Sequence, residues 1–248
     1  MERASEASVR AKEPKRQLRL LLVGHGRMGR LVESLAGEYG CQIAGVIDSR
    51  TAAGPAGAEL SQWYDVDVAV DFSTAAAVEV NVPALAKHGV DLVVGTTGWQ
   101  KDERRIREII KKAGTGIVVA PNFSPGVVLF EAVVAQAAGL FAAQTEFGAW
   151  LHESHHAKKK DAPSGTALML KRAMEDAGFP RPIDVASTRA GHIPGTHTVG
   201  FDGPAESVTL SHAARDRTAF ARGALLAARW VKGRRGWFTM HDVLGLEI

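Results

Sequence analysis

The chain has 248 residues, 46% hydrophobic and 23% charged, which is typical of a globular protein with one large core or two smaller ones. A formal net charge of +3 is too small to indicate nucleic-acid binding, and the only cysteine, Cys41, excludes an internal disulfide and fits a cytoplasmic location. No apolar run approaches the roughly 20 residues that span a bilayer, so no membrane segment is expected. Residues 1–17 are charged, lack the apolar core of a secretory signal, and are predicted to form a disordered tail.

Residues 18–122 alternate between apolar runs typical of buried strands and segments with helical periodicity. Met28, Leu31, Val32 and Leu35 recur at the spacing of an amphipathic helix face. Strands are predicted at residues 18–23, 42–47, 66–70, 90–94 and 117–120, with further helices ending near residue 87 and spanning 101–113. This alternation predicts an α/β domain, in which a doubly wound, Rossmann-like parallel sheet is covered by helices on both faces.

The pattern changes after residues 121–126, where Ser124 is placed to cap a helix that has Pro125 at its first position. Beyond this point strands are predicted at residues 146–153, 184–190, 197–201 and 206–212, with one clear helix at 166–177. Residues 123–216 are therefore expected to form a smaller α+β domain with an open mixed sheet. A helix over 220–231 and an apolar segment after it are expected to return to the first domain, which then comprises residues 18–122 and 217–248.

A glycine-rich turn follows the first predicted strand. Gly24, Gly26 and Gly29 form the pattern G-x-G-x-x-G, in which the glycines permit a tight turn, close approach of a pyrophosphate, and packing of helix on strand. Asp48 ends the next strand, where an acidic residue can bind ribose hydroxyls. Residues 95–98 and 120–123 also follow strands at the edge where ligands bind in such sheets. The alternative for all three loops is a purely structural role.

Residues 153–166 read Glu-Ser-His-His-Ala-Lys-Lys-Lys-Asp-Ala-Pro-Ser-Gly-Thr and precede a predicted helix. Free N–H groups at a helix start bind carboxylates, histidine transfers protons near neutral pH, and lysine is a charged donor. The stretch therefore indicates a catalytic site for a small dianionic substrate. A solvated basic loop is one alternative, and a metal site is another; no metal is expected, because no acidic or cysteine ligand cluster accompanies the two histidines.

This stretch resembles the signature E-x-H-H-x-x-K-x-D-A-P-S-G-T-A of the 4-hydroxy-tetrahydrodipicolinate reductases, also called dihydrodipicolinate reductases. The resemblance covers nearly all of the chain from residue 18 onward, and includes segments 26–29, 71–73, 95–98, 122–124, 189–197, 212, 217 and 220–224. It implies an NADH- or NADPH-dependent reductase of lysine and diaminopimelate biosynthesis that acts on a small dicarboxylate. Members of the family are commonly homotetramers assembled through the second domain.

By position, the resemblance implies that His155 is the catalytic proton donor or acceptor and that Lys159 is the catalytic lysine. It implies substrate contacts for His156, Ser164, Gly165, Thr166 and Arg217. It implies cofactor contacts for Gly24, His25, Gly26, Arg27, Met28, Asp48, Arg50, Gly95, Thr96, Thr97, Ala120, Pro121, Asn122 and Phe123. Two other classes remain as alternatives, namely another two-domain amino-acid dehydrogenase and a nucleotide-sensing regulator without catalysis.

Overall fold

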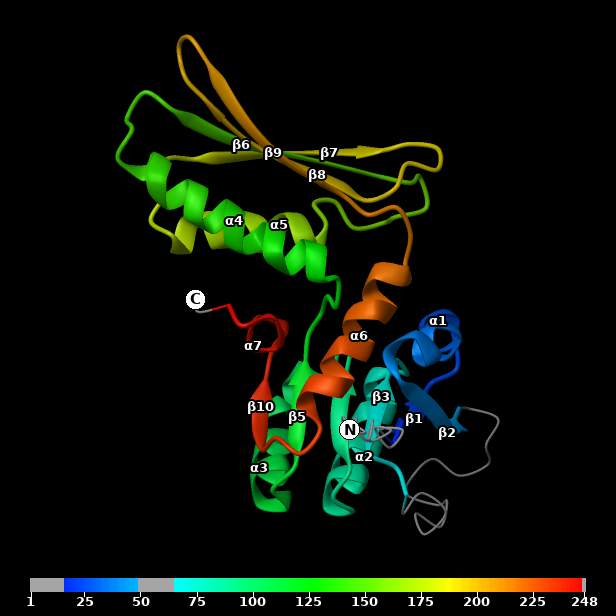
Figure 1. Ribbon diagram of the computed structural model, residues 1–248. Coiled ribbons are helices and arrows are strands. Elements are labelled where there is room, and N and C mark those ends of the chain that lie inside the picture. Colours follow the sequence, from blue (N-terminus) through cyan, green and yellow to red (C-terminus); the bar gives the residue numbers. More distant parts are fainter. Residues whose placement is uncertain (1–15, 49–64, 247–248) are drawn as a thin grey trace, which may run out of the picture.

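The computed structural model describes residues 16–48 and 65–246, which form two sheets stacked end to end along the molecule (Figure 1). Nearly all of the predicted N-terminal tail, and Arg50, lie outside these residues. The expected α/β architecture with a second, mixed-sheet unit is confirmed.

The larger sheet has six strands, and all of its strand pairs are parallel. In spatial order these are β10 (Gly236–Phe238), β5 (Gly116–Val119), β4 (Asp91–Val94), β3 (Val68–Asp71), β1 (Leu18–Val23) and β2 (Cys41–Ile47). The strand order reverses at β1, which lies between β2 and β3. In open α/β sheets ligands bind outside the carboxyl ends of the strands at such a switch point. The fold therefore places the glycine-rich turn, directly after β1, where a nucleotide would bind.

Helices cover both faces of this sheet because successive strand residues point to opposite sides. Leu20 and Leu22 of β1 pack against α1 (Arg27–Leu35) and α6 (Thr218–Val231). Leu21 and Val23 pack on the other face, against α2 (Ala75–Lys87) and α3 (Glu103–Ala113). Among the described residues, this part of the molecule also contains the short 3-10 turns η1 (Ala36–Tyr39) and η3 (Gln100–Asp102), and α7 (Met240–Leu244) near the end of the chain. Although α6 lies far after β1 in the sequence, it thus completes the core formed by β1 and α1.

The second sheet has four strands in the order β7 (Ile183–Arg189), β6 (Gly148–His155), β8 (Thr196–Asp202) and β9 (Ser207–Ala213). β6 and β7 are parallel and the other pairs are antiparallel. α4 (Pro125–Ala142) and α5 (Gly165–Asp176) lie on one face of the sheet, and the opposite face carries no helix among the described residues (Figure 1). Ser124 caps α4 as predicted, because its hydroxyl accepts a hydrogen bond from the Val127 amide.

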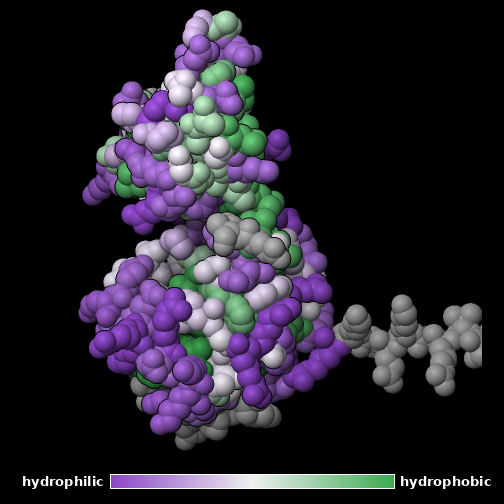
Figure 2. All heavy atoms as spheres, turned by 90° about the vertical axis from the view of Figure 1, so that its left-hand side faces the viewer, coloured by the Kyte–Doolittle hydropathy of each residue, from purple (hydrophilic) through white to green (hydrophobic). Residues whose placement is uncertain are grey.

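Helix α4 is more apolar than the sequence analysis recognised. By length and composition alone this 18-residue helix could cross a membrane, but core helices of globular proteins pass the same test. Its buried residues Val134 and Ala138 belong to the core shared with α5 and the second sheet. Leu129, Val133 and Leu140 are exposed, and hydrophobic side chains gather on the upper part of the molecule, which contains α4 and α5 (Figure 2).

We expect Gly223→Ala to destabilise the protein, because Gly223 of α6 lies directly against the loop that joins the two parts. A Cβ at this position would lie 1.6 Å from the carbonyl oxygen of Phe123, which is backbone and cannot move aside cheaply. Overpacking of this kind costs about 1–3 kcal/mol of unfolding free energy, or more. Differential scanning calorimetry should show a clearly lower unfolding temperature.

Gly139→Ala is the matched control, since Gly139 is a helical glycine of α4 whose added Cβ would lie 3.6 Å from its nearest neighbour, an ordinary contact. Alanine at this position should keep the unfolding temperature or raise it, because alanine is favoured over glycine in helices by about 1 kcal/mol. Equal losses in the two variants would contradict the packing argument.

Candidate active site

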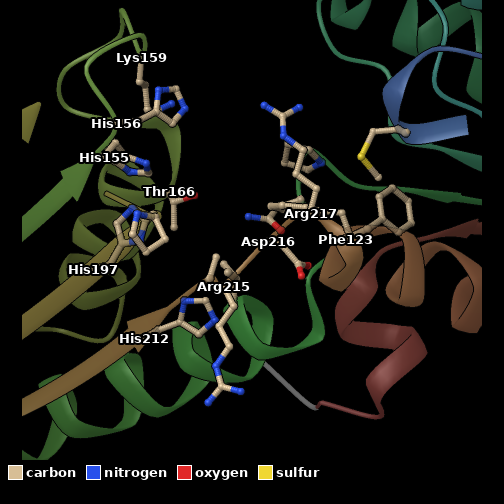
Figure 3. A pocket seen from close by; sticks show the side chains of 18 of the residues that line it. Phe123, His155, His156, Lys159, Thr166, His197, His212, Arg215, Asp216 and Arg217 are labelled. Carbon is tan, nitrogen blue, oxygen red and sulfur yellow. The ribbon is translucent and has the colours of Figure 1, made fainter. Parts of the chain in front are cut away.

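A pocket of about 510 Å³ lies between the two sheets (Figure 3). Figure 3 shows His155, His156, Lys159 and Thr166 on one side of it, facing Phe123 and Arg217 on the other. The predicted site residues that line this pocket are Met28, Gly95, Pro121, Asn122, Phe123, His155, His156, Lys159, Thr166 and Arg217. The predicted residues outside its lining, within the described part of the chain, are Gly24, His25, Gly26, Arg27, Asp48, Thr96, Thr97, Ala120, Ser164 and Gly165.

The glycine-rich turn has the geometry of a phosphate cradle. Gly24 has a φ of +90°, and a Cβ there would lie 2.6 Å from the Phe72 carbonyl oxygen. At Gly29 a Cβ would lie 2.2 Å from the Gly24 carbonyl oxygen, whereas at Gly26 it would meet nothing within 4 Å. No side chain caps the N-terminus of α1 and no acidic residue lies in its first turn. Open space in front of uncapped N–H groups fits the pyrophosphate of a dinucleotide.

Three predicted cofactor residues flank this cradle. His25 lies in the turn, but its Nε2 is 2.7 Å from a carboxylate oxygen of Glu33 on α1, so the imidazole is already paired within the protein. Arg27 is exposed on the first turn of α1. Asp48 follows the end of β2, at the same edge of the sheet as the glycine turn.

The loop after β4 is held by a buried carboxylate that the sequence analysis did not assign. Asp71 is fully buried, and its Oδ1 accepts hydrogen bonds from the Ser73 amide at 2.9 Å and the Thr96 hydroxyl at 2.8 Å. Burial raises the pKa of Asp71, although these hydrogen bonds oppose the shift. The Trp99 indole donates to the Thr96 carbonyl at 2.7 Å. The side chain of Thr96 is therefore engaged in fixing the loop, and Thr97 is exposed beside it.

An aromatic pair forms the floor of the pocket between the two loops. The rings of Phe72 and Phe123 meet edge to face with centroids 6.0 Å apart. Gly95 lies on the Phe72 ring, where a Cβ would come within 2.1 Å of Cε1. Nearby, Asn122 accepts a hydrogen bond from the Ser124 amide at 2.9 Å, and Ala120 is buried at the end of β5. The pair gives the pocket a flat apolar surface beside the glycine turn.

The opposite wall is formed by the end of β6, the loop after it, and the start of α5. His155 ends β6, and His156 and Lys159 follow in the loop. The Nζ of Lys159 lies 2.8 Å from Asp161. Thr166 lines the pocket in the first turn of α5, and the Gly165 Cβ position is open. A lysine, two histidines and a helix N-terminus thus surround one space, which suits a carboxylate.

Ser164, for which the resemblance implies a substrate contact, does not line the pocket. Its hydroxyl is buried, accepts a hydrogen bond from the Ala167 amide at 3.1 Å, and lies 3.1 Å from Nε2 of His197. The side chain therefore caps α5 and supports the histidine cluster.

Glu153 and His197 join His155 in a buried cluster behind this wall. Glu153 is 0% exposed, and its Oε2 lies 2.9 Å from Nε2 of His155 and 3.7 Å from Nε2 of His197. Burial opposes ionisation of Glu153, but hydrogen bonds from Ser164, Arg189 and Ser187 lower its pKa to about 2. Glu153 is therefore a carboxylate at neutral pH.

Burial keeps both histidines of the cluster neutral near pH 7. It lowers the pKa of His197 to about 4, with the neighbouring His155 adding to the shift. Burial also lowers the pKa of His155, while the negative charge of Glu153 opposes this change. A neutral imidazole at the pocket wall can accept a proton during catalysis and return it afterwards.

The same cluster has the composition of a metal site, which the sequence analysis did not foresee. The ligand atoms of Glu153, His155 and His197 all lie within 4.8 Å of one another. The Arg189 guanidinium, however, lies 2.5 Å from the other carboxylate oxygen of Glu153, so the negative charge is already balanced by a cation. The Ser164 hydroxyl also occupies Nε2 of His197. We therefore interpret the cluster as part of a proton-transfer site.

The hinge before α6 supplies charge from the other side of the pocket. Arg217, for which the resemblance implies a substrate contact, lines the pocket, and Arg215 and Asp216 precede it. Asp216 accepts a hydrogen bond from the Thr218 amide at 2.7 Å, which fixes the start of α6. Further lining residues without a predicted role are Phe72, Val127, His192, Ile193, Pro194, Gly195, His197, His212, Ala214 and Phe220. Several of these lining residues belong to segments 71–73, 189–197 and 220–224, which the resemblance includes. Their residue types alone did not indicate a role in the site.

Comparison with known proteins agrees with this geometry. Two family models match, described as "Dihydrodipicolinate reductase, N-terminus" over residues 18–123 and "Dihydrodipicolinate reductase, C-terminus" over residues 126–244. The 4-hydroxy-tetrahydrodipicolinate reductase of Christiangramia forsetii is 33% identical, covering 92% of this chain and 98% of the relative. The enzyme of the same name from Methanosarcina mazei is 39% identical, covering 85% and 82%.

Solved structures support the fold. The dipicolinate-bound dihydrodipicolinate reductase of Paenisporosarcina sp. TG-14 has a TM-score of 0.74 at 22% identity, covering 91% of this chain and 98% of that one. An amine dehydrogenase from Mycobacterium smegmatis has a TM-score of 0.63 at 13% identity, covering 91% and 95%. The two-sheet architecture is thus shared with other dehydrogenases, whereas both matching family models describe dihydrodipicolinate reductases alone. The chain belongs to the dihydrodipicolinate reductase family.

Proposed function

We propose that this protein catalyses the NADH- or NADPH-dependent reduction of (2S,4S)-4-hydroxy-2,3,4,5-tetrahydrodipicolinate to 2,3,4,5-tetrahydrodipicolinate, with loss of water, in lysine and diaminopimelate biosynthesis. The observation that carries the proposal is the pocket itself, because it has nucleotide-binding loops on one wall and a histidine, a lysine and a helix start on the other. The family membership and the names of the relatives support the same reaction.

The basic wall is proposed to hold the carboxylates of the substrate. A dianion is costly to desolvate unless charged and hydrogen-bonding groups replace its water. Thr166 and the α5 N-terminus offer donors, while His156 and Lys159 lie within the same pocket and Arg217 faces them from the hinge. The reductase of Paenisporosarcina sp. TG-14 was solved with dipicolinate, a planar dicarboxylate, which supports this substrate class.

The cofactor is proposed to lie over the glycine turn. The chemistry that a bound NADH or NADPH supplies is hydride donation to the substrate ring once its hydroxyl has left. Gly26 and the start of α1 would hold the pyrophosphate, and the backbone of the loop fixed by Asp71 and Thr96 would position the nicotinamide end. The aromatic floor of Phe72 and Phe123 would help to exclude water from the nicotinamide end of the pocket.

His155 and Lys159 are proposed to transfer protons around the departing hydroxyl and the ring nitrogen. Both line the pocket, and neutral His155 can accept a proton, whereas lysine donates one. These assignments place proton transfer on the substrate wall, away from the nucleotide loops.

The two parts of the chain are proposed to divide this work. Residues 18–122 and 217–248 would form the dinucleotide-binding domain, and residues 123–216 the substrate-binding and oligomerisation domain of a cytoplasmic homotetramer. The helix-free face of the second sheet and the exposed leucines on α4 support assembly through this domain. Light scattering coupled to size-exclusion chromatography would measure the oligomeric state, and a monomer would contradict the assembly.

A coupled assay tests the function. Freshly generated substrate is mixed with the protein and NADH or NADPH, and oxidation of the nucleotide is followed by its absorbance at 340 nm. For typical turnover numbers the signal develops over a time on the order of seconds to minutes. A substrate-dependent signal supports the proposed reaction. Activity with an amino acid and oxidised nucleotide would instead favour another two-domain dehydrogenase, and nucleotide binding with no turnover would favour a sensing regulator.

We expect the enzyme to use both NADH and NADPH, with a preference of roughly tenfold or less. Asp48 follows β2, where a carboxylate binds ribose hydroxyls and repels a 2′-phosphate. Arg27 in the glycine turn, or Arg50 two residues after Asp48, can offset that repulsion. At surface-like exposure each of these opposing effects is about 1 kcal/mol, so neither cofactor is excluded. Because aspartate is a short and rigid acid, we expect a slight preference for NADH.

The measurement is the ratio of kcat/KM values for the two cofactors in the wild type and in Arg27→Ala and Arg50→Ala. At least one variant should lose NADPH use selectively. Arg30→Ala is the control, because Arg30 is exposed on α1 beyond the glycine turn. A wild-type preference above about a thousandfold would contradict the balance of two small effects.

A further inference from the structure

We propose that Glu153 is the positioning residue of the active site: it holds the Nε2 of His155 inside the protein and leaves Nδ1 as the nitrogen that exchanges protons with the substrate. The catalytic importance of this arrangement rests on the proposed function, but the arrangement itself concerns the protein without ligands.

The carboxylate of Glu153 is fixed through one of its oxygens. Oε1 accepts hydrogen bonds from the Arg189 guanidinium at 2.5 Å, the Ser187 hydroxyl at 2.7 Å and the Ser164 amide at 3.1 Å. Donors from β7 and from the start of α5 thus hold Oε1. Since a carboxylate is planar and rigid, fixing Oε1 also fixes the direction in which Oε2 points.

That second oxygen lies 2.9 Å from Nε2 of His155. Both atoms are shielded from solvent, and neither has a hydrogen-bond partner among the described residues, so the ion-pair contact is what joins them. A substrate in the pocket therefore cannot reach Nε2, whereas part of the His155 ring still lines the pocket. Nδ1 is the remaining ring nitrogen, and proton exchange with the substrate is assigned to it.

The backbone opposite the ring has the shape that this orientation requires. Gly195 lies beside His155, and a Cβ there would come within 2.9 Å of Cε1 and 3.2 Å of Nδ1. Only glycine leaves the ring edge this room. His197 packs on the other side, with its ring edge to face and 5.2 Å away between centroids.

The charges around His155 favour one tautomer. Glu153 on β6 is the anion that acts on His155, and Arg189 and Lys159 are the cations. His197 on β8 is neutral, and the further histidine near it, His212 on β9, acts on His197. A proton on Nε2 faces the negative charge of Oε2 across the 2.9 Å ion-pair contact, whereas a lone pair there would be repelled, so the neutral ring is expected to carry its proton on Nε2 and its lone pair on Nδ1. When Nδ1 takes up a proton, the imidazolium stays beside the carboxylate, and when Nδ1 releases it the ring returns to the same tautomer.

The first test uses the protein without substrate or cofactor. Long-range ¹H–¹⁵N NMR spectra of histidine-labelled protein report which ring nitrogen carries the proton, and His155→Gln identifies the signal. We expect the Nε2–H tautomer at neutral pH. A proton on Nδ1 would overturn the proposal, whether or not the protein proves to be the proposed reductase.

The second test compares Glu153→Gln with Ser187→Ala. Glutamine keeps the shape of the Glu153 side chain, but it removes the negative charge and can present an N–H group to Nε2. We therefore expect kcat to fall by about 10–100-fold, which is the usual effect of losing a partner that orients a functional histidine. Because the Glu153 charge raises the pKa of His155, the limb of the kcat/KM profile governed by His155 should move to lower pH. Ser187→Ala loses one bond to Oε1 and keeps the Oε2 contact.

Ser187→Ala should therefore keep the wild-type pH profile, because Arg189 and the Ser164 amide still hold Oε1, and its effect should be limited to a lower unfolding temperature. A Glu153→Gln variant that folds, with an unmoved profile and a histidine tautomer like the wild type, would overturn the proposal. If that variant does not fold, the wild-type tautomer decides the question alone.

Discussion

Replacement of Lys159 by alanine is expected to reduce turnover by about 10²–10⁴-fold while leaving cofactor affinity close to that of the wild type. The lysine lines the pocket on the wall opposite the glycine turn. Its side chain is 24% exposed and its Nζ is 2.8 Å from Asp161, so it is held near the pocket. Removing it takes away a proton donor and a positive charge from the space proposed for the substrate.

The chain offers two matched controls beside it. Lys158 and Lys160 carry the same side chain in the same loop, but both are exposed and neither lines the pocket. Lys158→Ala and Lys160→Ala should therefore keep near-normal turnover. Isothermal titration with NADH and steady-state kinetics separate binding from catalysis. A Lys159→Ala enzyme with near-normal turnover, or three variants with equal losses, would remove Lys159 from the reaction.

The parallel sheet could be predicted from the sequence because its strands are buried on both faces and read as short apolar runs. The predicted strand at 66–70 ends one residue before the observed strand Val68–Asp71 does, because nothing in the sequence indicates that the fold buries Asp71 and satisfies its carboxylate with hydrogen bonds from neighbouring loops. The apolar run at 117–120 likewise located β5, within one residue at each end. Bounds shift by a residue or two where hydrogen bonding, not hydrophobicity, ends a strand.

The candidate site was predicted best where chemistry is local in sequence. The glycine turn and the histidine–lysine loop are continuous segments; His155, His156 and Lys159 of the loop line the pocket, and so does Met28 from the glycine-rich motif. Phe72 and His197 were not assigned roles, because an isolated aromatic or histidine carries no signal until the fold brings it beside its partner. Glu153 was noted only as the first residue of the signature and was given no role. Its hydrogen-bond partners Arg189 and Ser187 lie 36 and 34 residues away in the sequence, so the sequence alone did not connect them.

His155 and His156 are adjacent in the sequence, but the structure gives them different surroundings. His155 is the last residue of β6 and its Nε2 is 2.9 Å from the buried Glu153 carboxylate. His156 begins the loop and lies near Lys159 at the pocket wall (Figure 3). One histidine therefore belongs to a proton-transfer cluster, while the other lies with the groups proposed to hold a carboxylate.

We therefore expect His155→Gln to lower kcat by about 10²–10⁴-fold, the usual contribution of general acid–base catalysis. His156→Gln should act mainly by raising the KM of the substrate, because glutamine keeps a neutral donor but weakens the contact with a carboxylate. The measurement is kcat and KM for both variants at saturating NADH, with the NADH dissociation constant as the control for an intact nucleotide site.

The pH dependence of turnover separates the two histidines as well. Burial lowers the pKa of His155, so its neutral form is already present at pH 7. Below that pKa, protonation of His155 should reduce wild-type turnover, because it removes the proton acceptor. His155→Gln has no such group and should lose this acidic limb, whereas His156→Gln should retain it. Identical kinetic patterns and identical pH profiles in the two variants would contradict the division of roles between the adjacent histidines.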